Sequence, residues 1–69
     1  MYRNYFSEKT EDELRLLYKQ YLEWLESGSL GDNELGEIRD KYFEMGLAAP
    51  LVSIELDLLR EIAKHWSNK

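Results

Sequence analysis

The sequence of 69 residues contains no cysteine, one histidine and one proline. Without cysteine the chain can form neither a disulfide nor a thiolate metal site, and nothing in it argues for an oxidising compartment. No apolar run approaches the roughly 20 residues that a membrane-spanning helix needs, and the N-terminus lacks the apolar core of a secretory signal. We therefore expect a cytoplasmic protein that binds no metal or cofactor and does not engage a membrane.

Basic residues are also scarce, because nine lysines and arginines stand against 14 aspartates and glutamates, for a net charge of −5. A nucleic-acid-binding protein needs a basic face to neutralise phosphates, so we expect no nucleic-acid partner. The acidic excess gathers between residues 23 and 44, which we call the acidic strip. It is either a solvated surface or a contact surface for a basic protein. Its candidate contact residues are Glu23, Glu26, Glu34, Glu37, Asp40 and Glu44.

Three segments have the apolar periodicity of helices, at about residues 10–27, 33–45 and 50–66. Thr10 and Glu13 form a capping-box pattern at the first start, with Ser7 as an alternative cap one turn earlier. Pro50 is suited to the first position of the third helix. The sequence predicts one all-α domain over residues 1–69, a compact three-helix bundle with short loops.

The ends of the middle segment are also marked by sequence. Either Asp32 or Asn33 can cap its start, because both side chains accept hydrogen bonds from backbone N–H groups. Gly28 is expected to end the first helix, and Gly46 to end the second in a left-handed conformation.

The third segment is more apolar than one neighbouring helix can cover. Beside the stripe through Ile54, Leu58 and Ile62 it carries a second stripe, defined as Val52, Leu56, Leu59, Ala63 and Trp66. The remaining, polar side of this helix consists of Asp57, Arg60, Glu61 and Lys64. Either the N-terminal arm (residues 1–7, with Tyr2, Tyr5 and Phe6) or a second copy of the chain is expected to cover this second stripe. The predicted core is Leu14, Leu17, Tyr18, Tyr21, Leu25, Ile38, Tyr42, Ile54, Leu58, Leu59 and Ile62.

A second candidate surface is apolar. Gly36 and Phe43 lie seven residues apart on one line of the middle helix, away from its apolar stripe. Together with the second stripe they predict an apolar contact surface, whose candidate residues are Phe43, Val52, Leu59 and Trp66.

Patterns typical of catalysis are missing, so we expect no enzyme and no catalytic residue. No serine stands in a nucleophile elbow, and no glycine pattern suits a phosphate. Glu61 and His65 lie one helical turn apart, so the carboxylate could orient the imidazole for acid–base or metal chemistry. A histidine at a helix C-terminus is also favoured by the helix dipole, and we expect that structural role here. The middle and third helices could be taken for a DNA-binding helix-turn-helix, but the third is mainly apolar where a recognition helix needs exposed polar and basic residues.

One stretch resembles a known family. Ser53-Ile54-Glu55-Leu56-Asp57, followed by two leucines, is similar to the S-x-x-L-D stretch of Spo0E-like aspartyl-phosphate phosphatases, and Gly46–Pro50 resembles their inter-helix turn. Those proteins are short helical hairpins that act on phosphorylated response regulators. The resemblance implies that Asp57 acts at the phosphoryl group with Ser53 beside it. It covers about 20 residues, the interval from the turn to Ser53 is about one helical turn short, and the first helix has no counterpart.

The function that follows is a small non-enzymatic interaction module, a regulator or an inhibitor, whose partner is another protein or a second copy of itself. The alternative is the phosphatase that the resemblance implies.

Overall fold

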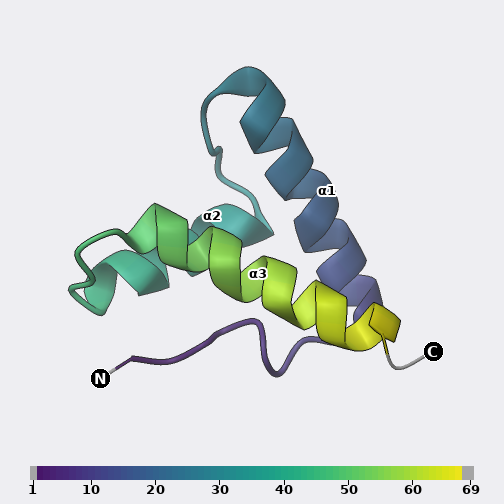
Figure 1. Cartoon of the computed structure of the whole chain (residues 1–69). Coiled ribbons are helices and arrows are strands. Elements are labelled where there is room, and N and C mark those ends of the chain that lie inside the picture. Colours follow the sequence, from purple (N-terminus) through teal and green to yellow (C-terminus); the bar gives the residue numbers. More distant parts are fainter. Residues whose placement is uncertain (1, 68–69) are drawn as a thin grey trace.

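The computed structural model describes residues 2–67 and contains three helices, α1 (Glu11–Ser27), α2 (Glu34–Glu44) and α3 (Pro50–Ser67) (Figure 1). The predicted all-α three-helix fold is confirmed, and each predicted helix end agrees within about one residue. The radius of gyration of 11.7 Å is close to the ~11 Å expected for a compact domain of this length.

The predicted start and end of α1 are formed by the residues that the sequence marks. The Thr10 hydroxyl accepts a hydrogen bond from the N–H of Glu13, and the Glu13 carboxylate accepts one from the N–H of Thr10. These bonds satisfy two backbone donors that the first helical turn leaves free. Gly28 ends the helix with a φ of 80°, and its N–H donates to the carbonyl of Trp24.

Of the two possible caps at the start of α2, Asp32 and Asn33, the structure shows Asn33 in that role. Its side-chain oxygen accepts a hydrogen bond from the N–H of Gly36 at 2.9 Å. Gly46 follows the helix with a φ of 72°, as predicted. Pro50 occupies the first position of α3, and the carbonyl of Ala49 accepts the first helical bond from Ser53. The loops are therefore short and are set by local backbone chemistry.

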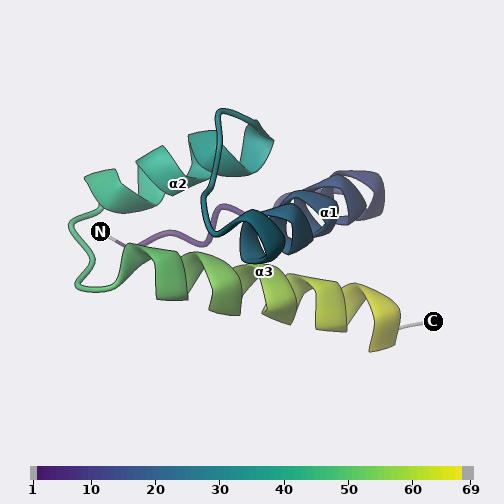
Figure 2. The same ribbon diagram turned by 90° about the horizontal axis from the view of Figure 1, so that it is seen from above.

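The three helices form a flat arrangement of 34 × 30 × 15 Å. α3 packs against both other helices more extensively than those pack against each other, and Figure 2 shows α1 and α2 on the same side of it. The N-terminal arm runs alongside α3 (Figure 1). Because the assembly is thin, one side of α3 has no neighbouring helix.

The core gathers where α3 meets the other two helices and the arm. Leu25 and Leu59 were predicted in it wrongly: they are 57% and 38% exposed. Leu25 lies on the last turns of α1, which project beyond the other helices (Figure 1), while Leu59 lies on the uncovered side of α3. Tyr18 is half-buried at the edge of the core. The buried apolar residues are Phe6, Leu14, Leu17, Tyr21, Leu35, Ile38, Tyr42, Ile54, Leu58 and Ile62.

Candidate functional site

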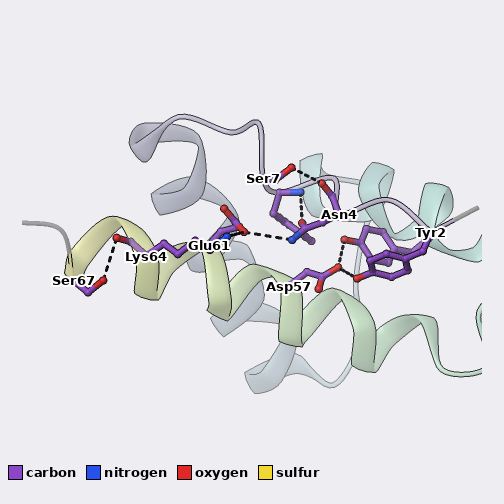
Figure 3. Close-up of polar contacts among 9 residues, drawn as sticks. Tyr2, Asn4, Ser7, Asp57, Glu61, Lys64 and Ser67 are labelled. Carbon is purple, nitrogen blue, oxygen red and sulfur yellow. Dashed lines mark hydrogen bonds and ion pairs between the residues drawn. The ribbon is translucent and has the colours of Figure 1, made fainter.

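The most polar buried feature is Asp57, near the middle of α3, which is 3% exposed. The Tyr42 hydroxyl donates to its Oδ2 at 2.7 Å, and the Tyr2 hydroxyl donates to the same oxygen (Figure 3). The ring of Tyr42 is also surrounded by the arm, with ring centres of Tyr5 and Phe6 at 5.7 and 5.9 Å. Asp57 and Tyr42 therefore bind the arm to the junction of α2 and α3.

One turn further along α3, Glu61 holds the next part of the arm. Its carboxylate is 5% exposed and accepts from Nδ2 of Asn4 at 3.4 Å and from Nζ of Lys64 at 3.3 Å (Figure 3). The Glu61–His65 pairing that the sequence allows is thus replaced by bonds to Asn4 and Lys64. Asp57 and Glu61 were assigned to the polar side of this helix, and the arm is the reason that they are buried.

The tyrosines around Asp57 are held in their protonated forms. Burial and the hydrogen bond to Asp57 raise the pKa of Tyr2 to about 12, and the same two causes raise the pKa of Tyr42 further. A neutral phenol that donates to a carboxylate is stabilised, because its ionisation would place two negative charges together. At neutral pH the hydrogen bonds of this cluster therefore hold the arm against α2 and α3.

The second stripe remains open to solvent. Val52, Leu56, Leu59 and Trp66 are 55%, 47%, 38% and 40% exposed, and Ala63 is exposed between them. Of the two coverings that the sequence left open, the arm is not the one found, because it follows the side of α3 that carries Asp57 and Glu61. A run of large apolar side chains is therefore left partly exposed along this side of α3.

Trp66 is fixed at the C-terminal end of the second stripe by α1. Its ring meets that of Tyr18 edge-on, with centres 6.5 Å apart, and the guanidinium carbon of Arg15 lies 5.7 Å from its centre. These contacts restrain the indole while leaving much of its surface accessible. A restrained aromatic side chain at a surface loses little freedom on binding.

The apolar line through Gly36 and Phe43 is not a continuous surface. Phe43 is 54% exposed, but Gly36 is buried under the carbonyl of Gly31, where a Cβ would collide with the oxygen. The α1–α2 loop crosses α2 here, which the sequence did not reveal. Phe43 thus stands alone as an exposed aromatic on α2.

The acidic strip is exposed at all six candidate positions but is interrupted by charge of the other sign. Asp40 forms an ion pair with Arg39 at 3.1 Å. Glu34 and Glu37 line a cavity between α1 and α2 that Lys41 and Lys9 also line. The remaining members are Glu23 and Glu26 on α1 and Glu44 at the end of α2.

Gln20 links α1 to α2 and was not predicted to be buried, although it is only 7% exposed. Its Oε1 accepts from the N–H of Leu35 at 2.9 Å, and its Nε2 donates to Glu34. That bond to Gln20 lowers the pKa of the Glu34 carboxyl. Glu34 therefore helps to join α1 and α2, in addition to its place in the acidic strip.

Two further properties bear on function. Among residues 2–67, no group of three or more histidine, aspartate or glutamate side chains is placed to hold a metal ion. In the same part of the chain, no helix combines the length and apolar character needed to cross a bilayer.

Comparison of the chain with known proteins found no matching family model, no matching curated protein and no matching solved structure. The resemblance to aspartyl-phosphate phosphatases therefore rests on the S-x-x-L-D stretch and the turn before it alone, and in this structure the carboxylate of Asp57 is enclosed by the arm and two tyrosines.

Proposed function

We propose that the protein is a small non-enzymatic interaction module that binds an apolar helical surface of a partner along the second stripe of α3. The observation that carries the proposal is the exposure of four large apolar side chains on one side of a single helix. Contiguous apolar surface of this kind is typical of an interface, whereas scattered exposed leucines are ordinary. We propose the cytoplasm as its compartment.

The acidic strip supports a weaker version of the same proposal. Its carboxylates are exposed, but Arg39, Lys41 and Lys9 lie among them, so its field is partly compensated. Exposed charge chiefly affects solubility and the rate of encounter. We therefore assign the contact to the second stripe and give the strip the secondary role of steering a basic partner.

Photo-cross-linking in cells that express the full chain tests this proposal. A benzophenone amino acid in place of Leu56 should trap a discrete protein adduct, and Leu59→Asp in the same chain should abolish it. The same group in place of Asp12, an exposed position on α1 outside both candidate surfaces, should trap none. Equal adducts from both positions, or none from position 56, would refute the second stripe. A third variant carries the group in place of Glu37, in the acidic strip. If only this variant traps an adduct, and the adduct disappears as salt rises, the contact belongs to the acidic strip.

The phosphatase alternative requires Asp57 to reach a phosphoryl group. The short resemblance and the position of Ser53 one turn before Asp57 are its only support. The enclosure of the Asp57 carboxylate argues against it. Incubation with a phosphorylated receiver domain tests it directly. Faster loss of phosphate that Asp57→Asn abolishes would favour the phosphatase, and an unchanged rate with wild-type protein would end that alternative.

A further inference from the structure

The second stripe has the spacing of a coiled-coil seam. Its members follow one another at intervals of four and three residues in alternation, over two heptads from Val52 to Trp66. Helices with this repeat bury their seams by packing against a helix with the same repeat. The open side of α3 therefore matches, in length and period, the open side of another α3.

Opposite charges flank this seam. At about 100° per residue, Glu55 lies on one border of the second stripe and Arg60 on the other. Glu55 is half-buried and its Oε2 accepts from the Tyr21 hydroxyl at 2.7 Å, a bond that leaves its second oxygen able to accept another. Arg60 is exposed. The two residues are five positions apart, the interval that joins the flanks of two parallel helices in a coiled coil.

We propose that the second stripe pairs with the same stripe of a second copy, with the two α3 helices parallel. This inference rests on the proposed function and names its partner. In the parallel arrangement Glu55 faces the partner's Arg60, and two-fold symmetry repeats that pair on the other border. In an antiparallel arrangement Arg60 would face the partner's Arg60, and like charges would oppose each other.

The arm and the Asp57 cluster do not obstruct this pairing. Asp57 and Glu61 lie on the side of α3 that the arm covers, whereas the second stripe lies beyond Arg60 on the open side. Five partly exposed side chains supply much less than the ~800 Å² per partner of a standard interface. The dimer is therefore weak and reversible, and it forms in the micromolar range.

Because the chain contains no cysteine, a single introduced thiol can report whether the two α3 helices are parallel or antiparallel. Val52→Cys places one thiol at the N-terminal end of the seam. In a parallel pair it meets its counterpart, whereas in an antiparallel pair the two thiols lie about 20 Å apart, since 14 residues of helix separate Val52 from Trp66. Phe43→Cys is the matched control, because Phe43 is equally exposed but lies on α2. Under mild oxidation we expect Val52→Cys to form a disulfide dimer and Phe43→Cys to stay monomeric.

Sedimentation equilibrium of the full chain supplies the second readout. Arg60→Gln should raise the dimer Kd about two- to tenfold in a parallel pair, because two exposed ion pairs are lost. It should lower the Kd in an antiparallel pair, because repulsion is relieved. Rapid cross-linking of Val52→Cys together with a raised Kd for Arg60→Gln supports the proposal.

A chain that stays monomeric throughout the micromolar range overturns it, as does cross-linking of Phe43→Cys at the rate of Val52→Cys. A dimer that Arg60→Gln tightens overturns the parallel pairing. If the chain is monomeric while position 56 still cross-links a different protein in a Leu59-dependent manner, this inference fails and the proposed function stands. If neither is seen, both fail.

Discussion

The Tyr42 hydroxyl donates to Oδ2 of Asp57 at 2.7 Å, which joins α2 to α3 inside the core. The same hydroxyl accepts from the N–H of Tyr5 at 3.3 Å, so one phenol oxygen connects the arm, α2 and α3. A buried carboxylate that loses its donor is costly, because the charge stays desolvated without compensation. The polar centre of this small domain therefore contributes to its stability in addition to the apolar core.

Tyr42→Phe should lower the free energy of unfolding by about 1–3 kcal/mol, because it removes one of the two hydroxyls that donate to the buried Asp57 carboxylate. Tyr5→Phe is the matched control: it deletes a hydroxyl from the same cluster, and no hydrogen bond of that hydroxyl is found among the described residues. Urea unfolding followed by circular dichroism measures both. An equal loss in the two variants would show that the Tyr42–Asp57 bond contributes nothing specific.

The arm should prove to be part of the core. Phe6 is fully buried, so Phe6→Ala should cost about 3–5 kcal/mol and leave so small a domain largely unfolded. Phe43→Ala makes the same change at an exposed position and should cost less than about 0.5 kcal/mol. Thermal unfolding of the two variants checks this pair. If Phe6→Ala unfolds at the wild-type temperature, the arm does not pack as described.

Gly36 should be intolerant of a side chain, although alanine is the better helix former by about 1 kcal/mol. The Cβ of Gly36→Ala would meet the carbonyl of Gly31, so we expect a net loss of about 1–3 kcal/mol. Gly31→Ala finds open space at its own Cβ and should be nearly neutral. The midpoints of urea unfolding measure the stability of both variants. A Gly36→Ala variant more stable than the wild type would contradict the crossing of the loop over α2.

Stability should fall at alkaline pH. The hydrogen bond to Glu55, followed by burial, raises the pKa of Tyr21 from 10.0 to about 12. Because the folded chain holds this phenol proton more tightly than the unfolded chain, the stabilisation is complete below pH 10.0 and is lost as pH rises to about 12. Urea midpoints measured across that interval should decline, and less steeply for Tyr21→Phe. A decline of the same slope in Tyr21→Phe would assign the effect to other groups.

The sequence determined the parts of the fold that depend on local chemistry. The bonds of Thr10, Glu13, Gly28 and Asn33 involve neighbours within a few residues, so their side chains alone predicted the helix ends. Residues such as Leu14 and Ile54 were predicted in the core because helical periodicity places them on the most apolar face.

What the sequence could not supply depends on contacts between distant segments. Asp57 was assigned to the polar side of its helix, and only Tyr2 and Tyr42, 55 and 15 residues away, make its burial tolerable. Phe6 lies in a segment without periodicity, so the sequence offered it only as a cover for the second stripe and not as part of the core. The second stripe was recognised from its spacing, but whether the arm covered it depended on the path of the arm along α3.

The most direct test of this account is sedimentation equilibrium of the wild-type chain beside Leu59→Asp. Leu59 is 38% exposed at the centre of the second stripe, so the substitution should leave the helical circular dichroism unchanged. We predict a reversible monomer–dimer equilibrium for the wild type in the micromolar range, and a Kd raised about tenfold or more for Leu59→Asp. A wild-type chain that is purely monomeric, or a dimer that Leu59→Asp leaves unchanged, would contradict the pairing of two α3 helices through this surface.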